Sequence, residues 1–240
     1  MDRPCSQLLH QLHQVIMAYT QKQLPNVILS NLEINAQDLI RLIANNEFLP
    51  QASIFEKTTY INQLAHFLEN FRQYIQKRFG IWAMINQPMM DQWVQQFPQQ
   101  RYLEIMAGNA SLSAALAQRD QKVIATDNGS WAAWSQTSRN CWFPVQKLDA
   151  HQAVQKYGAE SDVILLAWSP DGDPIDWQIL QLIRQLPNQP QFWIIGEYQG
   201  ATNSTLFWQR AHFKYDQRIH NINQYYPHFD LVKDRLLMVR

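Results

Sequence analysis

This chain has few cysteines and no net charge. Cys5 and Cys141 are the only two cysteines among 240 residues, and they stand far apart, at no spacing typical of a metal site. We therefore expect reduced thiols in a cytoplasmic protein and no bound metal ion. The 20 basic residues balance the 20 acidic ones. Most nucleic-acid-binding proteins carry an excess of positive charge, so this balance argues against a nucleic-acid partner.

Long apolar runs are absent as well. No unbroken stretch approaches the roughly 18 residues that a membrane-spanning helix needs, and the first residues lack the apolar core of a secretory signal. We expect no association with a membrane. Hydrophobic residues nevertheless make up 46% of the chain, which is enough for a sizeable core and argues against general disorder.

The first third of the chain is predicted to be helical. Apolar residues recur at helical spacing over 8–19 and 61–75, with a shorter candidate at 36–44. We assign residues 1–79 to an N-terminal helical region. Its apolar stripes could cover the later domain, pack on one another, or form the contact of a homodimer.

From residue 101 onward, short apolar strands alternate with helices. Strands are expected at 102–105, 122–126, 145–148, 162–168 and 192–195, and helices at 111–119, 150–157 and 175–186. Strands of nearly continuous apolar character indicate a parallel sheet that is covered on both faces. The end of the chain differs, because 215–222 and 235–240 are expected to pair as an antiparallel hairpin with no helix between them. We assign residues 80–240 to this second domain.

Glycine is rare, yet four of the seven glycines closely follow predicted strands: Gly108, Gly129, Gly172 and Gly196. Open α/β sheets bind ligands beyond the carboxyl ends of their strands, and glycine there lets the backbone turn tightly or approach a ligand. The clustering favours a ligand crevice, although simple turns are the alternative.

The stretch from residue 101 to 127 carries the clearest signal. Glu104 ends a strand, a turn of small residues follows, and a helix starts near Ser111 with unpaired backbone donors. Asp127 ends the next strand about twenty residues on, where a carboxylate can accept hydrogen bonds from ribose hydroxyls. This arrangement fits any nucleoside-bearing cofactor. Residues 108–113 also resemble a degraded dinucleotide motif, so a nicotinamide-dependent oxidoreductase stays open.

Three features favour a sulfonium nucleoside over a dinucleotide. Glu104 precedes the turn, where it can help to hold a cationic amine. Asp149 follows the third strand and is well placed for an adenine amino group. The antiparallel hairpin expected at the end of the chain is the third feature.

With these motifs the sequence resembles the class I S-adenosylmethionine-dependent methyltransferases, and in particular bacterial members. The matching segments are LEIMAGNASLSAAL, VIATDNGSW, KLDAHQAV, VILLAWSPDGDP, IIGEYQG and DRLLMVR. The resemblance covers about residues 80–240. It implies an α/β fold with a Rossmann-like, mostly parallel methyltransferase sheet, an antiparallel C-terminal hairpin strand, and S-adenosylmethionine as cofactor.

The resemblance also implies a role for each matching position. Glu104 would serve the methionine amino group indirectly, and Asp127 would bind the ribose hydroxyls. Asp149 would accept a hydrogen bond from the adenine amine, and Trp168 to Asp171 would face the sulfonium and the acceptor. The implied cofactor-binding set is Glu104, Met106, Ala107, Gly108, Asn109, Ala110, Asp127, Asn128, Asp149, Ala150 and Trp168.

Two positions depart from the family pattern. The chain has Met106 and Ala110 where the family usually has glycine. Alanine is tolerable there unless the backbone needs a positive φ. Met106 adds a side chain at the tightest point of the turn, which could narrow the methionine pocket or merely shift the loop.

The segment after the fourth strand holds the candidate catalytic residues, Ser169 and Asp171. Methyltransferases that act on amines often carry Asn, Asp or Ser before Pro-Pro-aromatic here, whereas this chain has Ser-Pro-Asp-Gly. The alternative for this segment is a plain turn. We expect methyl transfer to an unidentified small-molecule acceptor. The competing hypothesis is a catalytically inactive module that keeps the fold for binding.

Overall fold

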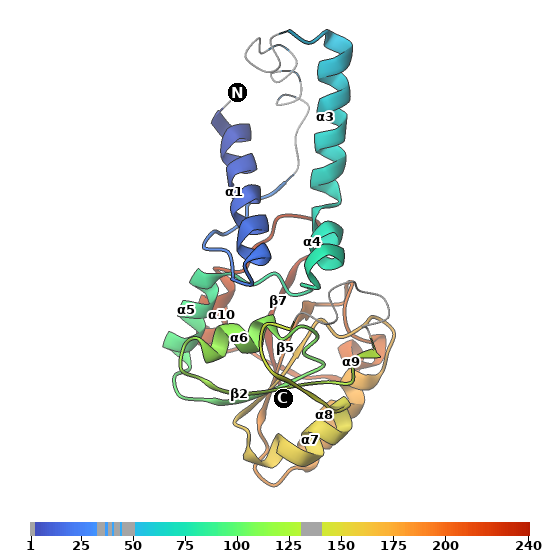
Figure 1. Cartoon of the computed structure of the whole chain (residues 1–240). Helices are drawn as coiled ribbons and strands as arrows, with labels where there is room; N and C mark the ends of the chain where they lie inside the picture. The colour runs from blue at the N-terminus through green and yellow to red at the C-terminus, as the bar shows by residue number, and fades with distance from the viewer. Residues whose placement is uncertain (1–2, 33–36, 38–39, 41–43, 45–50, 131–140) are drawn as a thin grey trace.

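The computed structural model describes residues 3–32, 37, 40, 44, 51–130 and 141–240. In the N-terminal region, α1 (Arg3–Thr20), α3 (Ile54–Glu69) and α4 (Phe71–Phe79) confirm the helices predicted from apolar spacing (Figure 1). The stripe at 61–75 is divided between α3 and α4 by Asn70, which leaves helical geometry at φ −101° and ψ 10°. The helix expected at 36–44 falls mainly outside the described residues.

The described strands form one sheet in the order β3-β2-β1-β4-β5-β7-β6. The strands are β1 (Arg101–Ile105), β2 (Lys122–Asp127), β3 (Val145–Lys147), β4 (Val163–Ala167), β5 (Gln191–Glu197), β6 (Phe213–Lys214) and β7 (Asp234–Val239). β1 to β5 are parallel, while β7 runs antiparallel to both β5 and β6. This order confirms the predicted Rossmann-like methyltransferase sheet.

The predicted C-terminal hairpin is wrong in its first arm. Residues 217–223 form a helix, α10 (Gln217–Asn223), which lies between β6 and β7 in the chain. Asp216 caps this helix by accepting a hydrogen bond from the backbone of Arg218 at 2.9 Å. Ile219 and Ile222 are both buried at helical spacing. A strand would have placed them on opposite faces, so the helix buries apolar surface that a strand would expose.

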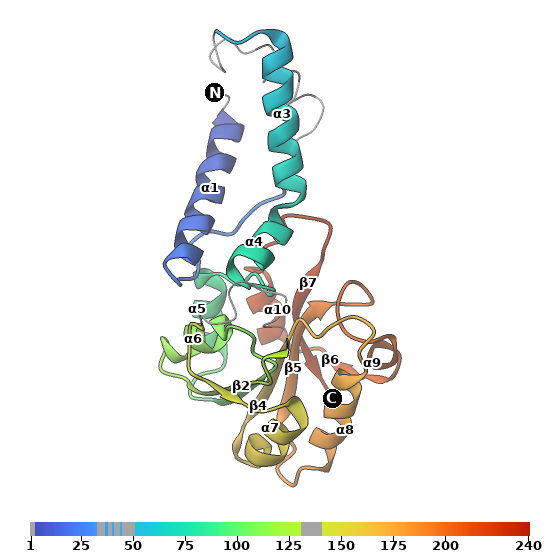
Figure 2. The same ribbon diagram turned by 45° about the vertical axis from the view of Figure 1, so that its right-hand side comes forward.

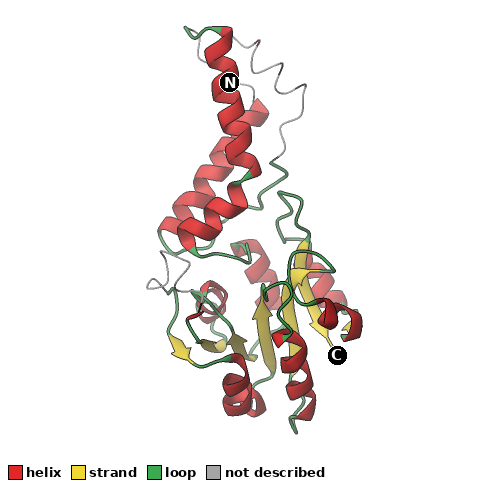
Figure 3. Cartoon of the chain, turned by 90° about the vertical axis from the view of Figure 1, so that its right-hand side faces the viewer, coloured by secondary structure: helices red, strands yellow, loops and turns green. Residues whose placement is uncertain are grey.

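Helices cover both faces of the sheet. α5 (Gln87–Gln96), α6 (Ser111–Ala117) and α10 share one core, and α7 (Ala150–Tyr157), α8 (Ile175–Gln185) and α9 (Thr205–Arg210) share the other. The side chains of β4 alternate between these cores: Val163 and Leu165 enter the first, and Ile164 and Leu166 enter the second. Figure 3 shows the strands between the helical layers.

The N-terminal helices stand at the carboxyl edge of the parallel strands. α1 and α3 extend away from the sheet, while α4 lies near the start of β7 (Figure 2). Tyr19 of α1 and Phe71 of α4 belong to the same core cluster as Trp193 and Leu236 of the sheet. The predicted boundary between residues 79 and 80 stays a prediction. No helix in the described part of the chain is long and apolar enough to cross a membrane.

Gly196, one of the four glycines that follow predicted strands, has a packing explanation. Gly196 lies inside β5, where an added Cβ would meet the Thr202 side-chain oxygen at 2.5 Å and that of Asn203 at 2.6 Å. Close approach of the loop after β5 therefore requires glycine at this position. Because packing explains Gly196, this glycine gives no support to a ligand crevice.

Candidate functional site

The turn after β1 is built from left-handed residues. Met106, Gly108 and Ala110 have φ values of 52°, 56° and 58°. The two positions that depart from the family's glycines therefore both need a positive φ. A non-glycine residue in this conformation costs about 1–2 kcal/mol. The sequence showed the substitutions but not this strain.

Hydrogen bonds from backbone amides of the turn to β2 hold the turn in place. The Ala107 amide donates to the Thr126 carbonyl at 3.0 Å, and the Gly108 amide donates to Asp127 Oδ2 at 2.9 Å. The other oxygen of Asp127 accepts from the Gly129 amide at 2.6 Å. The Asp127 carboxylate thus joins the loops that follow β1 and β2. It lies where the sequence predicted, at the carboxyl edge of the sheet.

Two asparagines of the predicted set contact the protein itself. Asn109 is buried, and its side-chain amide donates to the Phe79 carbonyl at 3.0 Å. This bond ties the turn to the end of α4. Asn128 is exposed, and its side-chain oxygen accepts from the Ser130 amide at 2.8 Å. Their predicted contacts with a cofactor stay predictions.

Glu104 is buried beneath the start of α6, where its carboxylate accepts hydrogen bonds from the Ser113 amide at 3.0 Å and from the Ser113 hydroxyl. Burial raises the pKa of Glu104 to about 7, although the bonds from Ser113 lower it. Ser113 is outside the predicted site residues. The sequence placed it only in the degraded dinucleotide motif at 108–113, which gave no signal for a hydroxyl bond to Glu104. The indirect role predicted for Glu104 is compatible with a carboxylate whose contacts lie inside the protein.

Glu104→Gln should change how stability depends on pH. The pKa of Glu104 is higher in the folded chain than in the unfolded one, so its stabilising contribution is complete below about pH 4.5 and is lost as pH rises through about 7. We expect the variant to gain about 3 kcal/mol over the wild type between pH 4.5 and 8. Urea unfolding of both proteins across this range measures the gain. If the difference in free energy of unfolding between the two proteins does not change with pH, the raised pKa assigned to Glu104 is contradicted.

Asp149 acts as the N-cap of α7. Its Oδ1 accepts from the Gln152 amide at 2.9 Å, and Gln152 Oε1 accepts from the Asp149 amide at 3.2 Å. This reciprocal capping box explains why α7 begins at Ala150, which is buried. The cap positions the carboxylate beside the end of β3. Adenine recognition by Asp149 and Ala150 stays a prediction.

The residue after β4, Trp168, is firmly held. Its φ is 57°, its amide donates to the Ile195 carbonyl at 2.8 Å, and its indole donates to Asp234 Oδ2 at 2.7 Å. Its ring also lies near the Trp82 ring, with 6.1 Å between centroids. Trp168 is therefore fixed at the carboxyl edge by contacts from three separate segments.

The two candidate catalytic residues have different surroundings. Ser169 is buried, and its carbonyl accepts from the Asn203 amide at 2.9 Å. Asp171 is exposed, beside Gly172 at a φ of 77°. This geometry matches the turn alternative for residues 171 and 172. Catalytic roles for Ser169 and Asp171 stay predictions.

Arg72 brings a charge from α4 to the same edge. Its Nε and Nη2 donate to the Asp230 carboxylate at 2.6 and 3.0 Å, and its Nη1 lies 3.5 Å from Asp234 Oδ2. The hydroxyl of Tyr226 also donates to Asp234, at 2.9 Å. Because more than 150 positions separate Arg72 from these partners in the chain, no local sequence pattern could have found the cluster.

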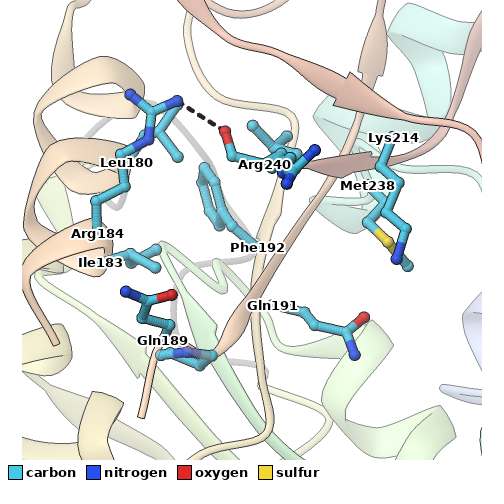
Figure 4. A pocket seen from close by; sticks show the side chains of 11 residues that line it. Leu180, Ile183, Arg184, Gln189, Gln191, Phe192, Lys214, Met238 and Arg240 are labelled. Atoms are coloured by element: carbon cyan, nitrogen blue, oxygen red, sulfur yellow. Dashed lines mark hydrogen bonds between the residues drawn. The ribbon is translucent and has the colours of Figure 1, made fainter. Parts of the chain in front are cut away.

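A pocket of about 610 Å³ lies at the opposite edge of the sheet (Figure 4). It is lined by α8, by the amino end of β5 and by the last residues of β7. Arg184 is one of its lining residues and donates to the carbonyl of Arg240 at 2.7 Å. The pocket is thus separate from the loops that follow β1, β2 and β4, and it is not the predicted cofactor site.

The similarities to known proteins described below are distant. No family model matches the chain, and no curated protein matches it. Among solved structures, magnesium protoporphyrin IX methyltransferase from Synechocystis PCC 6803, with bound SAH, is 14% identical, with 72% of this chain and 99% of that chain covered and a TM-score of 0.38. MtNAS in complex with MTA and tNA is 10% identical, with 100% and 98% covered and a TM-score of 0.41.

Human N-acetylserotonin methyltransferase in complex with SAM is also similar, at 13% identity, with 97% of this chain and 69% of that chain covered and a TM-score of 0.40. All of these TM-scores are below 0.5. The assignment of a class I methyltransferase fold therefore depends on the strand order, in which an antiparallel β7 lies between β5 and β6.

Proposed function

We propose that this chain binds S-adenosylmethionine and transfers its methyl group to a small-molecule acceptor. The observation that carries the proposal is the junction at the carboxyl edge of the sheet, where Asp127 at the end of β2 binds the Gly108 amide of the turn after β1. In an open α/β sheet this edge is where ligands bind.

The residues at the junction fit the cofactor. A carboxylate at the end of this strand can accept hydrogen bonds from ribose hydroxyls, and Asp127 would take this role. Ala107 and Gly108 are only half-buried and have little or no side chain, which lets the methionine part lie against the backbone. Asp149 and Ala150 would hold the adenine. The bound cofactor supplies a methyl group already activated by a positive sulfur, so the protein's contribution is mainly alignment.

A second candidate is a binding module without catalysis, and the left-handed Met106 favours it. Met106→Gly removes the backbone strain but also loses packing against the second core. We expect the wild type to bind S-adenosylhomocysteine and the variant to differ by less than about tenfold in Kd. If calorimetry instead shows binding only in the variant, the module hypothesis is favoured.

The direction of β7 argues against the alternative of a nicotinamide-dependent oxidoreductase. That hypothesis needs the parallel sheet to continue beyond β5, whereas β7 lies there in the antiparallel direction. Thermal unfolding with S-adenosylhomocysteine or NAD⁺ separates the two functions. A ligand at 100 times its Kd stabilises the folded chain by about 2.7 kcal/mol. We expect S-adenosylhomocysteine alone to raise Tm, and a rise with NAD⁺ alone would overturn the proposal.

Self-association through the N-terminal helices is a further part of the proposal. Ile54 and Phe55 at the start of α3 are 74% and 81% exposed, and exposed apolar groups of this kind favour contact with another copy of the chain. Sedimentation equilibrium of the wild type and of an Ile54→Ser, Phe55→Ser double variant tests it.

A further inference from the structure

Unpartnered polar atoms gather at the carboxyl edge near β4 and β7. Within the described part of the chain, four buried side-chain atoms have no hydrogen-bond partner in the protein: Arg72 Nη1, Ser169 Oγ, Asn203 Nδ2 and Asp234 Oδ1. Ser169 follows Trp168 directly after β4, Asn203 bonds to Ser169 through its backbone, and Asp234 begins β7. Buried polar groups in proteins nearly always have a partner. Their concentration at one edge therefore indicates a place where another molecule supplies hydrogen bonds.

Arg72 and Asp234 leave one donor and one acceptor side by side. The remaining guanidinium nitrogens of Arg72 are taken by Asp230. Asp234 Oδ2 is taken by the indole of Trp168 and the hydroxyl of Tyr226. Arg72 Nη1 lies 3.5 Å from Asp234 Oδ2, too far for a good hydrogen bond, and Asp234 Oδ1 is unpartnered. The protein thus leaves one donor of Arg72 and one acceptor of Asp234 without a partner.

Charge restricts what that group can be. Arg72 contributes one positive charge, and Asp230 and Asp234 contribute two negative ones. A ligand carboxylate would add a further buried negative charge, which is costly. A ligand ammonium could donate to Asp234 but would face the guanidinium of Arg72. A hydroxyl can accept from Arg72 and donate to Asp234 with one oxygen atom and no charge.

Aromatic rings surround the pair. The Arg72 guanidinium carbon lies 5.2 Å from the Trp168 ring centroid and 4.9 Å from that of Phe229. Trp82, which is 48% exposed, lies beside Trp168 and gives the aromatic surface an open side. Flat aromatic molecules pack well against such rings.

We infer that Arg72 and Asp234 form the recognition site of the methyl acceptor, and that the acceptor is a small aromatic molecule with a hydroxyl group held between Arg72 Nη1 and Asp234 Oδ1. The inference rests on the proposed function, because it names the acceptor class of the same site. It gives α4 of the N-terminal region a part in acceptor recognition.

Three matched probes test the hydroxyl directly. Fluorine NMR of the full chain, saturated with S-adenosylhomocysteine, is recorded with para-fluorophenol, para-fluorobenzoate and para-fluorobenzylamine. These molecules share a ring and differ in carrying a hydroxyl, an anion or a cation. We expect the phenol to bind at least about tenfold more tightly than the other two. Equal binding of all three, preference for the anion or the cation, or no binding of the phenol would overturn the inference.

A variant and a matched control locate the binding. In Asp234→Asn, the amide oxygen must keep accepting from Trp168 and Tyr226, so the NH₂ group takes the place of Oδ1 and the acceptor becomes a donor. We expect phenol binding to fall at least tenfold in this variant. The control is Asp162→Asn, in the exposed pair with Arg101 at the other edge, which should leave phenol binding unchanged.

The inference and the proposed function can fail separately. Phenol-selective binding without any binding of S-adenosylhomocysteine would contradict the proposed function and the acceptor role. Binding of S-adenosylhomocysteine without phenol selectivity would contradict only the inference. If Asp234→Asn does not fold, selectivity among the three probes in the wild type still decides the outcome.

Discussion

Replacing Arg72 with methionine should lower the free energy of unfolding by about 3–5 kcal/mol. Arg72 is buried, and the change leaves the carboxylates of Asp230 and Asp234 without their cation. Burial already raises the pKa of Asp234, against the lowering effect of Arg72, so removing the guanidinium worsens the environment of this carboxylate. Urea unfolding at neutral pH measures the loss.

The matched control is Arg101→Met. Arg101 makes a comparable bidentate contact with Asp162, with Nη2 at 2.7 Å from Oδ1, but its side chain is 52% exposed. Exposed ion pairs contribute about 0–1 kcal/mol, so this variant should unfold within about 1 kcal/mol of the wild type. Equal losses at the two positions would show that burial of the Arg72 cluster adds nothing to stability.

Asp127→Ala should weaken the binding of S-adenosylhomocysteine by roughly a hundredfold. The change removes the carboxylate proposed to accept from the ribose hydroxyls, and hydrogen bonds to charged groups contribute about 1.5–3 kcal/mol. It also releases the Gly108 and Gly129 amides, so the turn loses its connection to β2. Calorimetric titration of the variant and the wild type measures the difference.

The control for Asp127 is Asp91→Ala. Asp91 also bonds to a neighbouring residue, Arg119 at 2.8 Å, but its side chain is 67% exposed and belongs to α5. We expect the affinity of the Asp91→Ala variant for S-adenosylhomocysteine to match that of the wild type. An Asp127→Ala variant that binds as tightly as this control would remove Asp127 from the proposed site.

Local signals explain where the fold was predicted well. α7 occupies the predicted residues 150–157, because Asp149 and Gln152 form a capping box that marks its start. The buried strands were found from their apolar runs. The segment at 215–222 was predicted wrongly because Ile219 and Ile222 suit a strand in composition. Burial of both on one face, together with the Asp216 cap, makes it a helix.

Some residues of the candidate site could be predicted from local signals, and others could not. Residues at strand ends, such as Asp127, were predictable because parallel strands bring their carboxyl ends to one edge. The strain at Met106 and Ala110 was not, since composition does not report φ. The contacts of Arg72 with Asp230 and Asp234 could not be predicted, because they join segments more than 150 positions apart in the chain and follow no periodicity.

The most direct test of the proposed function is calorimetric titration of the folded wild type with S-adenosylhomocysteine. We expect one site per chain, which is saturated below millimolar ligand and loses affinity in Asp127→Ala. A folded sample that gives no binding heat at millimolar S-adenosylhomocysteine, at more than one temperature, would contradict the proposed function.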